Sequence, residues 1–176
     1  MSDIDFDYKL QTDSIVFDVG GFKGDFTHLI RSKWKCPVHC WEPVFVRDLK
    51  DRFASDPLVW IYDCALEDVN EDREIFVNGD STSMYFDSQG SVKQLIKVRS
   101  ITDFIEHQQL PAIDLLKLNC EGSEFRILNE LIKTGFINKV YNIAVQYHPH
   151  GHSGVDLSTT HDTRSKNDHW QWLVRK

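Results

Sequence analysis

The sequence of 176 residues lacks several features that would assign it to a specialised class of protein. No apolar run approaches the roughly 18 residues that a membrane-spanning helix needs. No dense block of Lys or Arg is present and the formal net charge is −7, so we expect neither a nucleic-acid partner nor binding to a membrane surface. The acidic start, residues 1–5, has neither the basic nor the apolar segment of a signal peptide, and the expected compartment is the cytoplasm.

Cysteines are few and lack the spacing of a metal site. The four cysteines, at positions 36, 40, 64 and 120, form no C-x-x-C pair. Cys36 and Cys40 flank His39 and leave a zinc pair conceivable, but no second pair follows. We therefore expect reduced and mostly buried thiols.

Alternating histidines at positions 148, 150 and 152 are the other candidate metal ligands. An extended backbone would place all three on one face, where His161 or Asp162 could complete a site. The intervening Pro149 and Gly151 make a persistent strand doubtful. We therefore expect no metal.

The sequence does contain a regular alternation of strand-like and helix-like segments. Strands are expected at 14–18, 38–41, 58–62, 113–118 and 140–147, with apolar residues at helical spacing after most of them. This alternation predicts an α/β fold with a doubly wound, mostly parallel sheet. The length fits a single domain, 1–176, with its core at 14–150. An additional strand is expected at 73–77, a loop over the crevice at 78–92, and a loop and a C-terminal helix within 151–176.

The most informative stretch is the turn after the first strand, Asp-Val-Gly-Gly-Phe-Lys-Gly at 18–24. Gly20, Gly21 and Gly24 permit positive φ and remove side chains where backbone N–H groups would face a ligand. Asp18 lies at the carboxyl end of the strand, where open α/β sheets place their ligand crevice. A glycine-rich turn without a ligand is the alternative, because such a turn alone is a weak motif.

Several segments, in order and spacing, resemble the FkbM-type family of S-adenosylmethionine-dependent methyltransferases. The matching segments are 18–24 (D-V-G-A-N-x-G in that family), 41–43 (an acid and a proline after the second strand), 63–66 (N-A-A-L), 98–104 (a strand followed by T-L-D-x-[FL]), 113–124 (I-D-L-L-K-I-D-V-E-G-x-E) and 144–148 (a strand ending in E-x-H). The resemblance spans roughly residues 14–150. It implies the Rossmann-like class I methyltransferase fold.

The chain also departs from that family pattern. Phe22 stands in place of the usual Asn, Asn119 in place of Asp, and Gln146 where Glu is common. Members of the family usually continue into a C-terminal antiparallel strand pair, and the end at Lys176 comes too early for both strands. We therefore expect that pair to be missing. An exposed sheet edge or apolar patch would follow, and with it a possible homodimer.

The resemblance implies a site for S-adenosylmethionine. The residues that it assigns to cofactor binding are Asp18, Gly20, Gly21, Phe22, Gly24, Glu42, Pro43, Asp63, Cys64, Ala65 and Asn119. Glu42 could accept hydrogen bonds from both ribose hydroxyls, or it could be only a solvated acid at a helix start. The segment 63–65 would lie beside the adenine, unless Asp63 is only a turn residue.

The family also implies transfer of the methyl group to a hydroxyl, on a sugar or a secondary metabolite. Such a transfer needs aligned reactants, exclusion of water and removal of a proton. His148, after the fifth strand, and Glu121, after the fourth, are the candidate catalytic residues, and the ordinary pKa of histidine favours His148 as the base. His148 could instead make a structural hydrogen bond. Ser81, Thr82 and Ser83 are expected to bind the substrate from the covering loop, or only to form a turn.

Two other functions stay open on the sequence. An acid about 20 residues beyond a glycine turn also suits NAD(P) and an oxidoreductase. That fingerprint needs G-x-G-x-x-G, and counted from Gly20 its second glycine is Phe22, which disfavours a dinucleotide. The departures from the family pattern and the early end motivate the other alternative, a catalytically silent binding module of the same fold.

Overall fold

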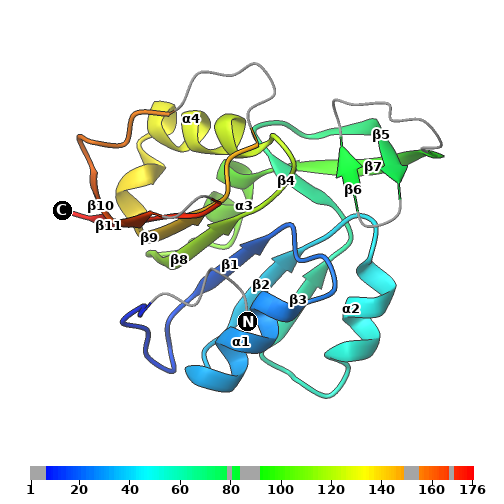
Figure 1. Cartoon of the computed structure of the whole chain (residues 1–176), viewed down its shortest axis with the longest axis horizontal. Coiled ribbons are helices and arrows are strands. Elements are labelled where there is room, and N and C mark those ends of the chain that lie inside the picture. The colour runs from blue at the N-terminus through cyan, green and yellow to red at the C-terminus, as the bar shows by residue number, and fades with distance from the viewer. Residues whose placement is uncertain (1–6, 79–80, 84–91, 149–154, 167–168) are drawn as a thin grey trace.

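The computed structural model of the chain describes residues 7–78, 81–83, 92–148, 155–166 and 169–176. Two sheets organise these residues, one of seven strands and one of four (Figure 1). No helix in the described part of the chain is long and apolar enough to cross a membrane.

The seven-stranded sheet has the order β10-β11-β9-β8-β1-β2-β3. Its parallel strands are β1 (Val16–Val19), β2 (Val38–Trp41), β3 (Val59–Tyr62), β8 (Ile113–Leu118) and β9 (Val140–Val145). Every residue of the central strand β1 is buried, because helices cover both faces of the sheet and apolar residues therefore follow one another without alternation. The predicted fold class is confirmed.

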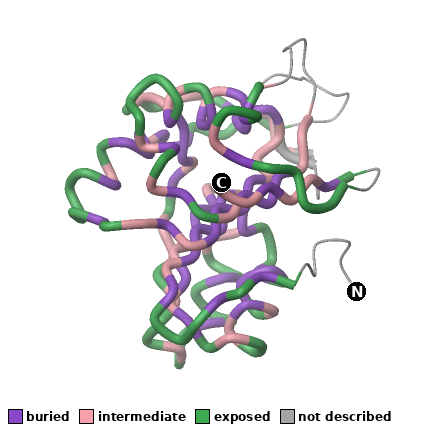
Figure 2. Tube along the Cα trace, turned by 90° about the vertical axis from the view of Figure 1, so that its left-hand side faces the viewer, coloured by how far each residue is buried: buried purple, intermediate pink, exposed green. Residues whose placement is uncertain are grey.

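Within the described ranges, four α-helices and one 3₁₀-helix pack on the large sheet. They are α1 (Asp25–Lys33), α2 (Val46–Arg52), α3 (Ile101–His107), α4 (Glu124–Thr134) and the 3₁₀-helix η1 (Phe136–Lys139). Figure 1 shows α1 and α2 on one side of the sheet and α3 and α4 on the other. Ile30 of α1 belongs to the same buried apolar cluster as Val16, whereas Leu128 of α4 belongs to the cluster that contains the next residue, Phe17. Buried segments accordingly run through the middle of the molecule (Figure 2).

The four-stranded sheet lies beside the large one and has the order β4-β7-β5-β6. Its strands are β4 (Ala65–Glu67), β5 (Glu71–Asn78), β6 (Ser81–Ser83) and β7 (Val92–Ser100). The strand expected at 73–77 is therefore present and longer. The loop expected at 78–92 contains β6, and its residues 79–80 and 84–91 lie outside the described residues. Ile75, Ile96 and Val98 form a small apolar cluster against Val44 and Ala65.

The C-terminal segment corrects two expectations. It forms an antiparallel pair, β10 (His161–Lys166) and β11 (Gln171–Arg175), and β11 pairs antiparallel with β9. The strand pair that we expected to be missing is present, and the C-terminal helix that we expected is a strand. The apolar residues around Trp170 suit either period, and pairing with β9, which buries Leu173, decides for the strand.

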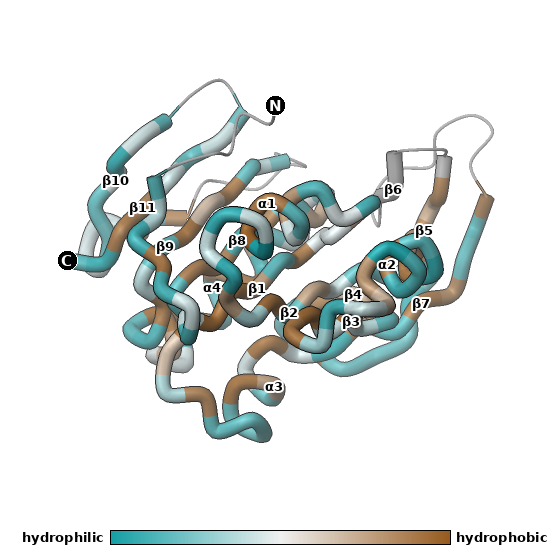
Figure 3. The backbone as a smooth tube through the Cα atoms, turned by 90° about the horizontal axis from the view of Figure 1, so that it is seen from below, coloured by the Kyte–Doolittle hydropathy of each residue, from teal (hydrophilic) through white to brown (hydrophobic). Residues whose placement is uncertain are grey.

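The edges of the large sheet also differ from the expected apolar edge. The outermost strand β10 is hydrophilic, and its residues after His161 are exposed (Figure 3). The opposite edge strand, β3, exposes 41% of Trp60. Polar residues on an edge strand oppose association with another chain, so a homodimer stays a prediction without support from the C-terminal edge.

Candidate active site

A cavity of about 380 Å³ opens where β1, β2 and β8 end. One wall comes from the loops of the large sheet and includes Gly20, Glu42 and Asn119, and another comes from the small sheet through Ile75 and Ile96. The further lining residues are Val19, Phe22, Trp41, Pro43, Phe45, Ala65, Leu66, Cys120, Glu121 and Ser123. The charged groups among these described lining residues are two carboxylates, with no Lys or Arg, so the cavity favours a cationic or neutral ligand.

The glycine turn takes its shape from close packing. Gly20 has φ +80°, and a Cβ there would lie 1.9 Å from the carbonyl oxygen of Asn119, so only glycine fits between the ends of β1 and β8. Gly21 has a similar restriction, since its Cβ would lie 2.2 Å from Cys40 Sγ. Gly24 packs over α2 at Leu49. Gly20 thus lines the cavity, whereas Gly21 and Gly24 shape the loop beneath it.

Glu42 is 6% exposed and points back to the glycine turn. Its Oε2 accepts a hydrogen bond from the Phe22 N–H at 2.8 Å. Its Oε1 accepts from the N–H groups of Val44 at 2.8 Å and Phe45 at 3.2 Å. Burial raises the pKa of Glu42, although these N–H groups oppose the rise. Of the roughly four acceptor positions of a carboxylate, one remains, on Oε2.

Phe22 forms part of the cavity wall and does not fill the cavity. Its φ is +48°, a conformation that Asn adopts more readily than Phe. Asn is the usual residue of the family pattern at this position. The ring meets the Phe45 ring edge-on, with 4.8 Å between centroids. The Phe22 side chain therefore narrows the cavity beside Glu42 while leaving it open.

Asp18 is fully buried and lies under the glycine turn, not in the cavity lining. Its carboxylate accepts hydrogen bonds from Lys117 Nζ at 2.8 Å and from Thr27 Oγ1 at 2.7 Å. Lys117 Nζ also donates to the carbonyl oxygen of Gly20 at 2.6 Å. Asp18 and Lys117 thus hold the turn from below. Our sequence reasoning missed Lys117, although a single lysine in the apolar run 113–118 was a usable signal, because a buried cation requires a partner.

Glu121, Glu124 and His148 form a second group of titratable residues beside the cavity. Glu124 is fully buried, and its two oxygens accept from the N–H groups of Cys120 at 2.7 Å and Gly122 at 2.9 Å. His148 Nδ1 lies 3.0 Å from Glu124 Oε1. Because an ionised carboxylate only accepts, this nitrogen is the donor. His148 Nε2 lies 3.7 Å from Glu121 Oε1.

The ionisation of this group follows from its contacts. Burial lowers the pKa of His148, but the hydrogen bond and charge of Glu124 and the charge of Glu121 outweigh it, and the pKa lies above its ordinary value. Burial raises the pKa of Glu124, but the hydrogen bonds from His148 and the Cys120 N–H outweigh it, and the pKa lies below its ordinary value. Both changes favour an ion pair.

The predicted site residues divide into two sets. Those that line the cavity are Gly20, Phe22, Glu42, Pro43, Ala65, Asn119 and Glu121. Those that do not are Asp18, Gly21, Gly24, Asp63, Cys64 and His148. Their cofactor or catalytic roles stay predictions. Ser81, Thr82 and Ser83 form β6, and their side chains lie outside the described residues.

The metal ligands considered on the sequence are only partly described. His150 and His152 lie outside the described residues, and within those described no group of three or more His, Cys, Asp or Glu could hold a metal ion. His161 is buried, and its ring nitrogens lie 2.9 Å from Thr160 Oγ1 and 3.1 Å from the Val140 carbonyl oxygen.

Comparisons with known proteins give one family match and two similar solved structures. The family model described as the methyltransferase FkbM domain matches residues 18–173. The crystal structure of a methyltransferase FkbM from Methylobacillus flagellatus KT aligns over 80% of this chain with a TM-score of 0.54 and 20% sequence identity. This chain covers 34% of that protein, about a third of its length. The 23S rRNA methyltransferase ErmE aligns over 96% of this chain and 64% of its own, with a TM-score of 0.45 and 10% identity. No curated protein matches the sequence.

Proposed function

This chain belongs to the methyltransferase FkbM domain family, and from that premise we propose that it transfers a methyl group from S-adenosylmethionine to a hydroxyl oxygen of a small molecule, a sugar or a secondary metabolite, within one domain. The observation that carries the proposal is the cavity at the ends of β1, β2 and β8, which combines the close-packed turn at Gly20 with two carboxylates. Its negative charge suits a ligand whose reactive centre is a sulfonium cation.

The cavity offers suitable contacts for each part of the cofactor. The remaining acceptor position on Glu42 Oε2 would take one ribose hydroxyl, fewer than the two expected from the sequence. Pro43, Ala65 and Leu66 give an apolar surface for the adenine. Gly20 and Asn119, on the other side of Glu42, would bind the amino-acid end.

Glu121 is the better candidate for the proton acceptor. Bound S-adenosylmethionine would supply an electrophilic methyl group on a positively charged sulfur. As the acceptor oxygen forms its bond to the methyl carbon and the carbon–sulfur bond breaks, the hydroxyl proton would pass to Glu121, which lines the cavity. His148 lies behind Glu121, and its raised pKa leaves less of the neutral imidazole available to accept a proton than in an ordinary histidine. Protonated His148 would instead orient the Glu121 carboxylate.

The same cavity disfavours NAD(P). A dinucleotide brings a pyrophosphate, which needs donors and open space at the glycine turn. The lining residues that the structure describes include no cation, and the Phe22 ring occupies part of the wall beside the turn. We therefore do not propose an oxidoreductase. A fluorescence titration with NADH should give no saturable signal.

One observation favours a catalytically silent module as the second candidate. Three backbone N–H groups already bind the Glu42 carboxylate, as they would if its role were only to shape the loop. Such a module would bind the cofactor weakly or not at all, and it would methylate no hydroxylated compound.

Calorimetry with S-adenosylmethionine and S-adenosylhomocysteine tests the proposal. We expect saturable binding with a Kd in the micromolar range, weakened in Glu42→Ala. Glu130→Gln, which alters an ion pair with the exposed Lys133 of α4 and is not among the cavity lining residues, is the control and should bind as the wild type does. A folded sample that shows no binding at millimolar ligand would exclude a methyltransferase.

Methyl transfer separates the two candidates. Labelled S-adenosylmethionine and a panel of sugars and phenolic or macrocyclic alcohols would identify an acceptor. With that acceptor, Glu121→Gln should still bind the cofactor and lose roughly 100-fold in kcat. Weak cofactor binding together with no turnover on any hydroxyl would support the silent module.

A further inference from the structure

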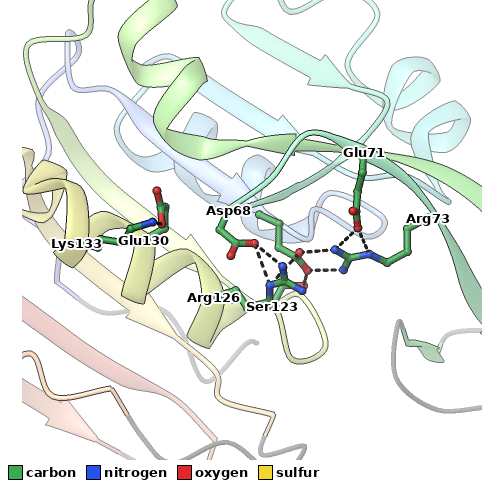
Figure 4. A network of polar contacts seen from close by, with 8 residues as sticks. Asp68, Glu71, Arg73, Ser123, Arg126, Glu130 and Lys133 are labelled. Carbon is green, nitrogen blue, oxygen red and sulfur yellow. Dashed lines mark hydrogen bonds and ion pairs between the residues drawn. The ribbon is translucent and has the colours of Figure 1, made fainter.

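Glu67, the last residue of β4, is a fully buried carboxylate that neither the proposed chemistry nor the proposed cofactor contacts use. Ser123 Oγ donates to its Oε1 at 2.7 Å. Two guanidinium nitrogens of Arg73 donate to its two oxygens, at 2.9 and 2.8 Å. Arg126 Nε lies 3.2 Å from Oε2. Figure 4 shows Arg73 on one side of this network and Ser123 with Arg126 on the other.

The partners of Glu67 come from the two walls of the cavity. Arg73 belongs to β5 of the small sheet, and two positions further along the same strand Ile75 lines the cavity. Ser123 immediately precedes α4 and lines the cavity itself, and Arg126 is in the first turns of that helix. Glu67 therefore connects the wall built by the small sheet to the loop that carries Asn119 and Glu121.

The chemistry of the network makes this connection rigid. A buried carboxylate needs its cationic partners, because removing them leaves an uncompensated charge. The paired hydrogen bonds of a planar guanidinium with a carboxylate fix both distance and orientation. The two arginines and Ser123 can contact Glu67 together only at one separation of the walls. The small sheet is also attached by the ion pair of Arg126 with Asp68, the residue after β4, at 2.8 Å, and by Leu66 in the main apolar cluster. Apolar contacts at Val44 and a 3.5 Å contact between Gln94 Nε2 and the Pro43 carbonyl oxygen add to these.

We propose that Glu67, with Arg73 and Arg126, is a positioning network that fixes the separation of the two cavity walls and so determines which ligands fit between them. The effect on ligand binding rests on the proposed function, whereas the attachment of the small sheet does not. Glu67 acts through Ser123 and Ile75 and contacts no reacting atom.

Glu67→Gln and Glu71→Gln form a matched pair of variants. Glu71 also contacts Arg73, and its side chain is 46% exposed. The same substitution there removes the negative charge of one partner of Arg73 and leaves the contacts with α4 in place. We expect amide hydrogen exchange in β5 and β7 of Glu67→Gln to accelerate about tenfold or more, with β1 and β8 unchanged. The Kd for S-adenosylhomocysteine, measured by calorimetry, should rise roughly tenfold. Glu71→Gln should change neither quantity more than about twofold.

Any other result would overturn part of this proposal or the proposed methyltransferase function. Unchanged exchange in β5 and β7, or equal acceleration in all strands, would overturn the network as a local attachment. Faster local exchange with unchanged Kd would overturn its role in ligand fit. If the wild type does not bind S-adenosylhomocysteine, the proposed function fails and exchange alone decides the attachment. If Glu67→Gln does not fold, Arg126→Gln removes the ion pairs of α4 with Glu67 and Asp68 through a partly exposed side chain. It should give the same local pattern, reduced by the Ser123 hydrogen bond that remains.

Discussion

Two buried carboxylates lie at the same end of the large sheet, Glu42 after β2 and Glu124 at the start of α4. They have similar partners, but their pKa values are shifted in opposite directions. Glu42 accepts three backbone N–H groups, and its pKa lies above the ordinary value because burial dominates. Glu124 accepts two backbone N–H groups and a hydrogen bond from His148, and its pKa lies below the ordinary value despite burial.

The comparison separates the effect of backbone N–H groups on the pKa of a buried carboxylate from the effect of a hydrogen-bonded imidazole. Three N–H groups do not outweigh the cost of removing the Glu42 charge from water, whereas two N–H groups and an imidazole do so for Glu124. Glu124 is therefore already compensated within the protein, and its role is to hold His148 and the 120–122 turn. Glu42 lines the cavity and keeps one acceptor position, so a ligand can still improve its environment.

The same substitution, glutamate to glutamine, should have different consequences at the two positions, and the larger loss of stability is expected at Glu124. Glu124→Gln places an amide NH₂ group against backbone donors and removes the counter-charge of His148. We expect the free energy of unfolding to fall by about 3 kcal/mol, as for other broken buried pairs. Urea denaturation at pH 6 measures it. A loss below about 1 kcal/mol would show that His148 does not compensate Glu124 in the folded protein.

Glu42→Gln should affect ligand binding more than stability. Removal of a buried charge with a raised pKa offsets the weaker hydrogen bonds, and the free energy of unfolding should change by no more than about 1 kcal/mol. The affinity for S-adenosylmethionine should fall roughly 10- to 100-fold, because a charge-assisted hydrogen bond to the ribose becomes a neutral one. Urea denaturation measures the free energy of unfolding of Glu42→Gln and Glu124→Gln, and titration calorimetry measures their affinity for S-adenosylmethionine. Equal loss of stability in the two would remove the distinction.

The sequence predicted those parts of the molecule that depend on local pattern. Apolar runs gave the parallel strands, and the turn at Gly20 with an acid at Glu42 was recognisable because both follow their strands directly. Glu124 stood in a matched segment, but its role depends on His148, which is 24 residues away and approaches only through the pairing of β8 with β9. No local feature of the sequence indicates such a contact.

The misses have the same origin. The Glu67 network joins β4, β5 and α4, and an isolated Glu after an apolar pair has no distinctive pattern. The C-terminal strand around Leu173 fits helix and strand periods equally, and only the free edge of β9 selects the strand. Position within the sheet, unlike periodicity, arises from contacts between residues far apart in the chain.

The smallest expected effect is the pH dependence of stability, and His148 gives it a sign opposite to that of Glu124. The pKa of Glu124 is depressed below 4.5, so its contribution is present above pH 4.5 and is lost as pH falls through the folded-state pKa. The pKa of His148 is raised above 6.5, so its contribution is fully present below pH 6.5 and is lost as pH rises through the folded-state pKa. The pair should stabilise the protein most between pH 4.5 and 6.5.

His148→Gln tests this sign, because glutamine can still donate to Glu124 but does not titrate. Urea denaturation should show that the wild type loses about 1 kcal/mol between pH 6 and pH 9 in excess of any change in His148→Gln. His107→Gln, on the exposed surface of α3, should retain the loss seen in the wild type. An identical loss in wild type and His148→Gln would mean that the imidazole gains no proton affinity on folding. Glu124 would then resemble Glu42, with its charge stabilised by backbone N–H groups alone.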